Sequence, residues 1–274
     1  MIMDDVNARG LVLLGCGKMG SAMLAGWLRG GLAKEAVSVI DPAPSDWVRE
    51  LAAKGARLNM ALPEAPAICV IAVKPQIMVD ALPSLVELGN GPTLFLSIAA
   101  GTPIAALETI LGVKTPILRA MPNTPAAVGH GITALVGNGA ALPAHLSLGE
   151  TLLGAIGETV RLEAEAQMDA VTAVSGSGPA YVFHLIETLA AAGEAEGLAP
   201  GLAMRLALVT VAGAGDLAEK ADEPPAELRA NVTSPGGTTA AALGVLMDKE
   251  RGFPSLMARA VAAAAARSRE LGRG

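Results

Sequence analysis

The first half of the chain alternates short apolar runs with stretches of helical spacing, and few folds accommodate that alternation. The candidate strands are Leu11–Leu14, Val37–Ile40, Ile68–Val73, Leu94–Ile98 and Ile117–Ala120, followed by Ile132–Val136 and Glu158–Leu162. The candidate helices between them are Met19–Gly30, Trp47–Lys54, Pro75–Leu88 and Pro103–Leu111. Alternation at this pitch predicts βαβ units. Because the apolar runs are nearly continuous, we expect a mainly parallel sheet that is covered on both faces.

The second half of the chain has a different character. Beyond about residue 164 the strand signals nearly vanish, and the candidate helices are Ala180–Ala195, Pro200–Ala221, Pro235–Asp248 and Phe253–Leu271. We therefore expect two domains, an α/β domain over residues 1–163 and an all-α domain over residues 164–274. A length of 274 residues agrees with two domains.

Composition and charge exclude several classes of protein. Hydrophobic residues make up 52% of the chain and charged residues 17%, which excludes a disordered protein. The net charge of −6 argues against a nucleic-acid-binding protein, because phosphate contacts need a basic surface. No polybasic segment points to a membrane surface, and even the apolar run Leu206–Ala214 is about half as long as a bilayer span. We expect a soluble protein with no nucleic-acid or membrane partner.

The cysteines and the N-terminus bear on the compartment. Cys16 and Cys69 each lie beside a candidate strand, so we expect two reduced thiols, as in a cytoplasmic protein; a reactive thiol is the less favoured alternative. The acidic segment Met1–Asp5 lacks the basic start of a signal peptide. Only 2% of the residues are aromatic, and an Ala-rich helical half often buries its apolar faces in a subunit interface.

A glycine-rich segment follows the first candidate strand and opens the first candidate helix. Its residues are Gly15, Cys16, Gly17, Lys18, Met19 and Gly20. Gly15 allows a tight turn, Gly17 lets the backbone approach a pyrophosphate, and Gly20 lets the helix pack closely on the sheet. The helix N-terminus offers free N–H groups and a positive dipole end to the diphosphate. The segment predicts a dinucleotide site, against the alternative of an ordinary Gly-rich turn.

An acidic residue supports the dinucleotide interpretation. Asp41 directly follows the Val37–Ile40 run, 21 residues beyond Gly20, where a carboxylate reaches the ribose 2′-hydroxyl. The alternative is a turn aspartate before Pro42. Because a carboxylate repels a 2′-phosphate, Asp41 favours NADH over NADPH.

Three further loops end candidate strands at the edge where doubly wound sheets bind ligands. Their candidate cofactor residues are Ala72, Val73, Lys74 and Pro75, then Ala99, Ala100 and Gly101, then Pro122 and Asn123. Lys74 either lines the cofactor cleft or is a surface lysine beside a helix cap. The small residues of the second loop leave room for a flat ring, and two prolines, Pro122 and Pro125, fix the third loop. Rigid loops in this position usually carry function.

Two Gly/Ser/Pro loops precede helices in the second half, at Ser175–Tyr181 and Thr233–Thr239. Each offers N–H groups, hydroxyls and a positive helix end, which suits a small carboxylate; a plain capping motif is the alternative.

The three histidines, His130, His145 and His184, lack metal-ligand spacing, so we predict no metal site.

Taken together, these motifs resemble one family, the pyrroline-5-carboxylate reductases. The matching segments are Gly15–Ala22, Ala72–Pro75, Ser97–Gly101, Arg119–Pro125, Asp169–Tyr181 and Val232–Thr239. The last two are far more specific than the glycine loop. The resemblance implies a Rossmann-type α/β N-terminal domain and an all-α C-terminal dimerisation domain. It implies an intertwined homodimer, which in the family often assembles into decamers, and the NAD(P)H-dependent reduction of 1-pyrroline-5-carboxylate, a cyclic imino acid, to L-proline.

The resemblance also implies roles for individual residues. The expected substrate-binding residues are Ser177, Ser234, Gly236, Gly237, Thr238 and Thr239. Among them Thr239 lies near the ring nitrogen and is the candidate catalytic residue. Asn59 matches a cofactor-side asparagine. Asp41 departs from the family, whose members commonly carry a neutral or phosphate-friendly residue there and use NADPH well, so the family pattern and the local charge favour different cofactors.

Two other functions compete with this interpretation. A β-hydroxyacid dehydrogenase also opens with a GxGxMG loop, but it needs a lysine early in its helical domain, and no lysine occurs between Lys114 and Lys220. A non-catalytic dinucleotide sensor would not need the loops Ser175–Tyr181 and Thr233–Thr239.

Overall fold

The computed structural model describes residues 2–272 and divides the chain into two compact units. The α/β unit comprises residues 1–176 together with 265–274, and the helical unit comprises residues 177–264. We expected one boundary between residues 163 and 164. In the structure the helical unit begins only at residue 177, and the chain from residue 265 onward belongs again to the α/β unit. The reason is packing: Met168 and Ala173 are buried, and Ser268 donates a hydrogen bond to Asp169. These contacts join residues 164–176 and the last turns of the chain to the α/β unit.

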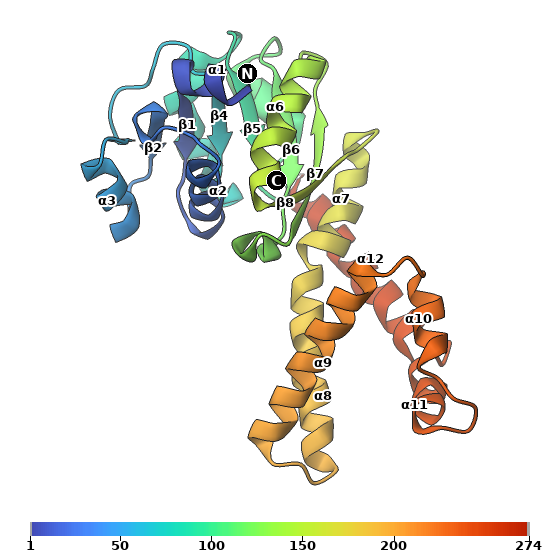
Figure 1. Cartoon of the computed structure of the whole chain (residues 1–274). Helices are drawn as coiled ribbons and strands as arrows, with labels where there is room; N and C mark the ends of the chain where they lie inside the picture. Colours follow the sequence, from blue (N-terminus) through green and yellow to red (C-terminus); the bar gives the residue numbers. More distant parts are fainter. Residues whose placement is uncertain (1, 273–274) are drawn as a thin grey trace. The chain divides into compact units, whose positions relative to one another are not determined.

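The α/β unit is built on one eight-stranded sheet in the order β3-β2-β1-β4-β5-β6-β7-β8 (Figure 1). The strands are β1 Leu11–Leu14, β2 Val37–Ile40, β3 Arg57–Leu58, β4 Ile68–Ile71, β5 Leu94–Ser97, β6 Ile117–Met121, β7 Gly131–Gly137 and β8 Gly157–Arg161. All neighbours pair in parallel except β6 and β7. The expected strands therefore form a mainly parallel Rossmann-type sheet, to which the two-residue β3 is an addition.

Helices cover the sheet, and most of them follow the expected pattern. Those of the α/β unit are α1 Ile2–Arg9, α2 Lys18–Arg29, α3 Asp46–Ala53, α4 Met78–Ala81, α5 Ile104–Leu111, α6 Pro143–Leu153 and α7 Met168–Val171. The expected helix Pro75–Leu88 is instead a 3₁₀ turn, the short α4 and a second 3₁₀ segment, Leu82–Leu88. A proline at position 83 removes a backbone donor inside that stretch, which disfavours a continuous α-helix. Neither α1 nor α6 was expected.

The core lies on both faces of the sheet, because successive strand residues point to opposite sides. Leu11 and Leu13 of β1 belong to one buried cluster, with Met23 and Trp27 of α2. Their neighbours Val12 and Leu14 belong to a second cluster, which includes residues of α4 and α5. Burial on both faces explains why the strands read as continuous apolar runs.

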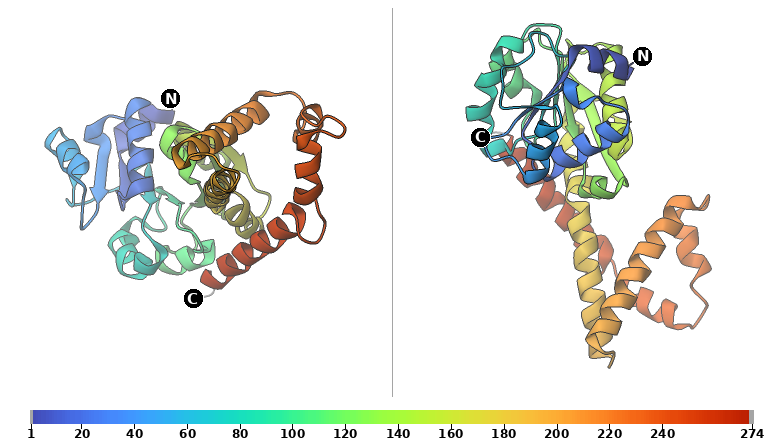
Figure 2. Two further views of the ribbon diagram at one scale, coloured as in Figure 1. Left: turned by 90° about the horizontal axis from the view of Figure 1, so that it is seen from below. Right: turned by 60° about the vertical axis from the view of Figure 1, so that its left-hand side comes forward.

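The helical unit contains helices only. They are α8 Gly178–Ala195, α9 Pro200–Lys220, α10 Pro225–Asn231, α11 Thr238–Leu246 and the first part of α12 Phe253–Leu271. Helices α8 and α9 pack against each other near the turn that joins them, and they diverge away from it (Figure 2). The helix expected at Pro235–Asp248 begins three residues later, because the segment Ser234–Gly237 forms a turn; α10 was not expected.

Helix α9 is long and apolar enough to cross a membrane by length and composition. A single helix of this kind is weak evidence for a membrane span, since helices that pack inside soluble proteins pass the same test. From the sequence we considered only uninterrupted apolar runs, and none of them is long enough to span a bilayer. Helix α9 as a whole is longer than any such run because it continues through the charged residues Arg205 and Asp216.

Candidate functional site

The glycine loop joins β1 to α2, and its three glycines have three different steric reasons. Gly15 has a φ of +86°, and a Cβ there would lie 2.8 Å from Val73 Cγ1. At Gly17 a Cβ would meet nothing within 4 Å, so open space lies beside this residue. A Cβ at Gly20 would lie 2.6 Å from the Gly15 carbonyl oxygen. The loop is therefore tightly folded on its inner side and open at Gly17, as the approach of a pyrophosphate requires.

The N-terminus of α2 leaves backbone donors available beside that opening. Gly17 is the N-cap and provides no side-chain cap, and the first N–H with an intrahelical partner is that of Ser21, which donates to the Gly17 carbonyl at 2.8 Å. The N–H groups of Lys18, Met19 and Gly20 thus lack helical acceptors. These donors and the helix dipole fit a dinucleotide diphosphate.

Asp41 follows β2 and is hydrogen-bonded to the same loop. Its Oδ2 accepts the Cys16 N–H at 2.8 Å, and its Oδ1 accepts the Ala43 N–H at 2.9 Å. Asn59, in the left-handed region with a φ of +52°, pairs with the Asp41 backbone through both ends of its amide at 2.8 and 2.9 Å. Each carboxylate oxygen has more than one acceptor site, so Asp41 retains capacity for a ribose hydroxyl. The hydrogen bonds of the Asn59 side chain therefore fix the backbone of Asp41.

The two cysteines are buried and are not joined by a disulfide. Burial raises the pKa of the Cys16 thiol, although a hydrogen bond with Ser21 acts in the opposite direction. Burial alone raises the pKa of Cys69. Both thiols are therefore protonated and unreactive, and the Cys16 backbone rather than its sulfur serves the loop.

The glycine loop and the three strand-end loops enclose one cavity of about 350 Å³. Its lining contains the expected residues Gly17, Lys18, Met19, Ala72, Val73, Lys74, Ala99, Ala100, Pro122 and Asn123. Ile98, Met121 and Thr124 also line the cavity and adjoin these segments, whereas Gly176 comes from the later turn Thr172–Gly176. Of the remaining expected cofactor residues, Gly15, Cys16 and Gly20 form the loop behind this wall, while Asp41, Asn59, Pro75 and Gly101 lie outside the lining. Parallel strands bring these loops to one edge, which is why distant segments of sequence meet.

Asn123 connects the cavity wall to an irregular helical turn. Its Oδ1 accepts the Ile132 N–H at 3.0 Å, and its Nδ2 donates to Ser175 Oγ at 3.2 Å. Ser175 belongs to a π-helical turn, Thr172–Gly176, of the kind that is frequent at functional sites. Gly176 leaves room for Met121, whose Cε would lie 2.5 Å from a Cβ at that position. The sequence alone did not predict the hydrogen bond between Asn123 and Ser175.

The candidate substrate loop lies in the helical unit, between α10 and α11. Ser234–Gly237 is a turn in which the Gly237 N–H donates to the Ser234 carbonyl at 3.0 Å, and Gly236 has a φ of +72°. Gly237 is the N-cap of α11, so the N–H groups of Thr238 and Thr239 have no helical acceptors. Ser177 is the N-cap of α8, without a side-chain capping bond. Each loop has the open helix terminus that anion binding needs.

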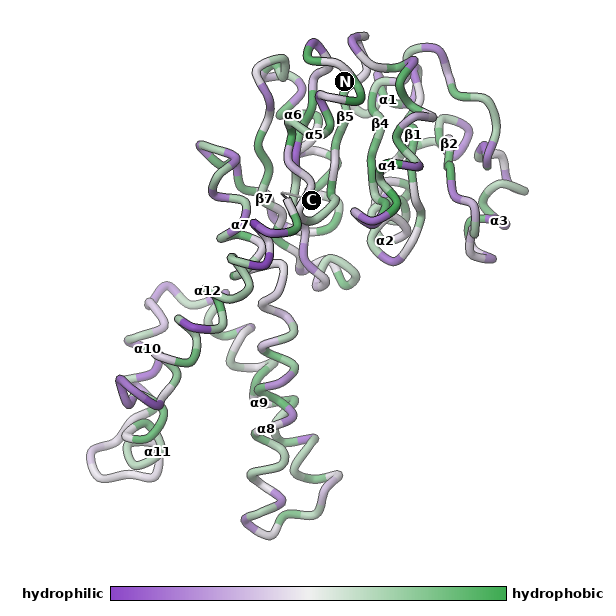
Figure 3. Tube along the Cα trace, turned by 180° about the vertical axis from the view of Figure 1, so that it is seen from behind, coloured by the Kyte–Doolittle hydropathy of each residue, from purple (hydrophilic) through white to green (hydrophobic). Residues whose placement is uncertain are grey.

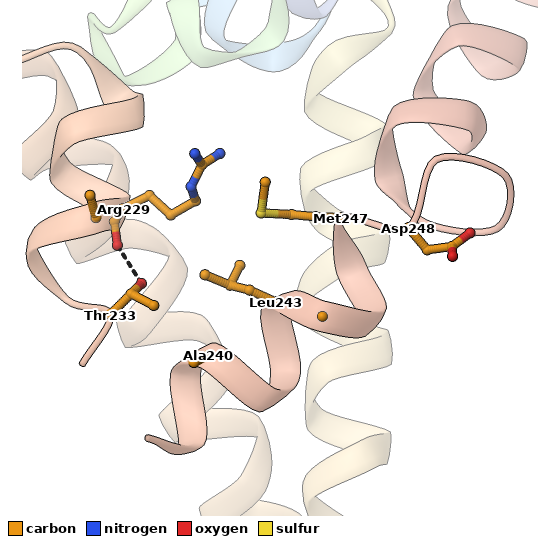
Figure 4. A pocket seen from close by; sticks show the side chains of 8 residues that line it. Arg229, Thr233, Ala240, Leu243, Met247 and Asp248 are labelled. Atoms are coloured by element: carbon orange, nitrogen blue, oxygen red, sulfur yellow. Dashed lines mark hydrogen bonds between the residues drawn. The ribbon is translucent and has the colours of Figure 1, made fainter. Parts of the chain in front are cut away.

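A separate cavity of about 530 Å³ lies between α10 and α11 (Figure 4). Arg229, Leu243 and Met247 contribute side chains to it, and the Thr233 hydroxyl donates to the Arg229 carbonyl at 2.6 Å. None of the expected substrate residues lines this cavity. Within residues 2–272 no group of three His, Cys, Asp or Glu side chains is placed to hold a metal ion.

Comparison with known proteins covers both units. Residues 165–271 match the family profile described as pyrroline-5-carboxylate reductase dimerisation, and residues 11–101 match the profile described as NADP oxidoreductase, coenzyme F420-dependent. The chain is 38% identical to the pyrroline-5-carboxylate reductase of Pseudomonas aeruginosa over 95% of this chain and 96% of that protein. It is 38% identical to the pea (Pisum sativum) enzyme of the same name over 98% of both chains.

A solved structure agrees with these sequence relatives. The pyrroline carboxylate reductase of Plasmodium falciparum with NADP bound matches with a TM-score of 0.83 and 31% identity, covering 97% of this chain and 99% of that chain. The similarity therefore spans the α/β unit and the helical unit together, at an identity well above the level that shows the fold alone. This chain belongs to the pyrroline-5-carboxylate reductase family.

Proposed function

We propose that this chain reduces 1-pyrroline-5-carboxylate to L-proline by hydride transfer from NAD(P)H, the last step of proline biosynthesis. The observation that carries the proposal is the near full-length match to relatives that bear this name. The cavity formed by the glycine loop and the strand-end loops supplies a place for the cofactor that fits this chemistry.

The α/β unit would hold the dinucleotide. The N–H groups of Lys18, Met19 and Gly20 bind the diphosphate, and the Asp41 carboxylate binds the adenosine ribose. The nicotinamide then lies against Ala99, Ala100 and Pro122, which are small or rigid and leave room for a flat ring. When bound, the cofactor supplies the hydride.

The loop Ser234–Thr239 would hold the substrate carboxylate. The N–H groups of Thr238 and Thr239, at the N-terminus of α11, donate to the carboxylate together with the Ser234 hydroxyl. The Gly237 N–H is already used within the turn, so its contribution is to shape the loop. Gly236 gives the turn its left-handed residue, and Ser177 adds a hydroxyl from the start of α8.

The proposed reaction needs no strong general acid or base from the protein. A cyclic imine is basic enough to be protonated in water, and the iminium accepts hydride directly at carbon to give the amine. The protein therefore contributes orientation and a carboxylate anchor rather than a strong acid. Thr239 orients the ring nitrogen with its hydroxyl, which explains how a site without an expected catalytic His or Lys suffices.

The preferred cofactor is NADH on the evidence of the local charge. The Asp41 carboxylate would face the 2′-phosphate of NADPH, and it is fixed in place by the N–H groups of Cys16 and Ala43. The named relative with NADP bound supports the opposite preference. An assay of kcat/KM with each cofactor decides the point, and a much higher value with NADPH would contradict the NADH preference.

The chain would assemble as an intertwined homodimer, and further into an oligomer such as a decamer. The matched dimerisation profile supports self-association. Large apolar side chains are exposed along the helical unit, among them Phe183 on α8 and Leu202, Leu206 and Val209 on α9. Figure 3 shows that hydrophobic residues recur along the trace of both helices. An apolar surface of this extent needs a covering partner in water. The proposed compartment is the cytoplasm, since both buried thiols are free.

The decisive experiment is a spectrophotometric assay with 1-pyrroline-5-carboxylate and each reduced cofactor. Oxidation of cofactor with formation of proline supports the proposal, whereas binding of NADH without turnover of the imine would favour a dinucleotide sensor.

Thr239→Ala tests the role of the ring-orienting hydroxyl. We expect kcat/KM to fall by about tenfold to a hundredfold, as for the loss of a hydrogen bond to a charged group. Thr239→Ser retains the hydroxyl and serves as the matched control. Unchanged kcat/KM in Thr239→Ala would show that the hydroxyl has no part in the reaction.

A further inference from the structure

A second cavity of the α/β unit is independent of the cofactor cavity. It has a volume of about 210 Å³ and is lined by Gly101, Pro103, Arg119, Asp169, Ser268, Arg269 and Gly272. No residue lines both cavities. The end of α12 closes over Gly101, where a Cβ would lie 2.8 Å from Leu271 Cβ. A residue without a side chain is therefore needed at position 101 for α12 to complete this cavity.

Arg119 of β6 brings a buried guanidinium to the cavity. Its side chain is only 8% exposed, and Nη1 donates to Glu165 Oε1 at 2.7 Å. The same oxygen also accepts the Ile104 N–H at 2.8 Å. This is the one side-chain hydrogen bond that Arg119 makes within residues 2–272, yet a guanidinium carries five N–H donors. Because no fully enclosed polar side-chain atom in that range lacks a partner, the remaining donors of Arg119 keep some accessibility, and Arg119 lines this cavity.

The cavity also carries a carboxylate. Ser268, which is buried, donates its hydroxyl to Asp169 Oδ1 at 2.6 Å, and this bond fixes the carboxylate on α7 against α12. Within the described chain no donor is bonded to Asp169 Oδ2. Arg269, one residue beyond Ser268, adds an exposed guanidinium to the lining. The cavity therefore presents cationic donors and an anionic acceptor in one small space.

We infer that this cavity binds a small free α-amino acid. The ligand's carboxylate pairs with the guanidinium groups of Arg119 and Arg269, and its ammonium pairs with the Asp169 carboxylate. The charges favour a zwitterion over a simple anion, because Glu165 already neutralises Arg119 and Asp169 offsets Arg269. Drug-sized ligands occupy pockets of about 300–1,000 Å³, so a cavity of 210 Å³ restricts the ligand to a small side chain. The inference does not depend on the proposed reduction.

Isothermal titration calorimetry of the full-length protein with L-alanine tests this site. We expect saturable binding that weakens about tenfold or more in Arg269→Gln and in Asp169→Asn, because each change removes one charge-assisted hydrogen bond. Arg267→Gln is the matched control, since Arg267 lies on the same helix, pairs with Glu270 and does not line the cavity. It should bind L-alanine as the unmodified protein does.

Two further titrants separate the zwitterion from its halves. Acetate carries only the carboxylate and methylammonium only the ammonium, so each should bind about tenfold or more weakly than L-alanine. Binding of acetate as tight as that of L-alanine would overturn the inference in favour of a plain anion site. So would an absence of binding by L-alanine at millimolar concentration, or equal binding by Arg269→Gln. Arg269 is exposed, so its substitution keeps the test valid if Asp169→Asn does not fold.

Discussion

At the scale of single residues, Asp41 has two roles that the structure joins in one side chain. It caps the glycine loop by accepting the Cys16 N–H, and its second proposed role is to bind the ribose of the cofactor. Removing the side chain would therefore disturb the loop as well as the charge. A substitution that removes the charge and keeps one of the two accepting oxygens separates the two roles better than removal of the side chain.

Asp41→Asn is that substitution. We expect kcat/KM with NADPH to rise by about tenfold, because the 2′-phosphate no longer faces a carboxylate, while the value with NADH changes much less. Steady-state assays with both cofactors measure the change. Asp46→Asn, at an exposed carboxylate of α3, is the control and should leave both values as they were. Parallel losses with both cofactors would instead show that loop capping dominates.

At the scale of the elements, one buried hydrogen bond ties α2 to α6. Trp27 is 1% exposed, and its indole N–H donates to the Leu152 carbonyl at 2.7 Å. The pairing satisfies a carbonyl at the end of α6, where helical donors run out. The bond holds α2, whose N-terminal N–H groups we propose to bind the diphosphate, against α6.

Trp27→Phe should lower the free energy of unfolding by about 2 kcal/mol, because the buried Leu152 carbonyl would lose its indole donor. Urea unfolding followed by circular dichroism measures the loss. Trp47→Phe is the matched control, since Trp47 is 38% exposed, and its effect should stay within about 0.5 kcal/mol. Equal effects at the two tryptophans would refute the role of the buried bond.

A second contact between elements makes stability depend on pH. Arg161 of β8 donates through Nε and Nη2 to the two carboxylate oxygens of Glu150 on α6, both at 2.6 Å. This hydrogen bonding lowers the pKa of Glu150 below its usual value. A lowered folded-state pKa gives stability that is present above the ordinary carboxyl pKa, about 4.3, and is lost as the pH falls through the folded-state pKa.

Glu150→Gln should therefore make the melting temperature fall less steeply than in the unmodified protein below about pH 4. The difference should be small and should shrink in high salt, since the pair is solvent-accessible. Thermal scans across the acid range at two salt concentrations measure it. Glu158→Gln on β8 is the control, and identical slopes for Glu150→Gln and the unmodified protein would rule out the linkage.

At the scale of the whole molecule, the helical unit has too little core for its apolar content. Its buried hydrophobic residues are Ala190, Ala203 and Ala207, whereas many larger apolar side chains are exposed. Small side chains let α8 and α9 pack closely, but they leave the larger ones outside. Self-association would bury these exposed apolar side chains, in agreement with the matched dimerisation profile.

Leu206→Glu places a charge on the apolar stripe that Leu202, Leu206 and Val209 form on α9. We expect this variant to shift the protein toward smaller species, because burying an unpaired carboxylate in an apolar interface is costly. Size-exclusion chromatography with light scattering measures the mass. Val113→Glu is the control, since Val113 is also an exposed apolar residue but belongs to the α/β unit. An unchanged mass for Leu206→Glu would exclude this stripe from the interface.

The sequence alone determined the elements that depend on local pattern. Mostly apolar runs specified six of the eight strands, because a strand buried on both faces consists largely of apolar residues, and the mixed run at β8 was also expected as a strand. Gly15 and Gly20 specified the tight loop between β1 and α2, because a Cβ at either position would meet neighbouring atoms, whereas Gly17 leaves the loop open. The sequence did not predict the short strand β3 or the helices α1, α6 and α10. Each of these elements has eleven residues or fewer and mixed polarity, so its periodic signal is weak.

Tertiary structure alone decided which distant groups meet. Asp41 caps the loop at Cys16, Asn123 reaches Ser175, and Arg119 pairs with Glu165 beside Asp169 and Ser268. Such pairings depend on strand order and on where α12 returns to the sheet, and neither leaves a local mark in the sequence. The steric needs of a backbone turn depend on neighbouring residues, whereas the partner of the buried Arg119 comes from a segment 46 residues away, which only the folded chain brings into contact.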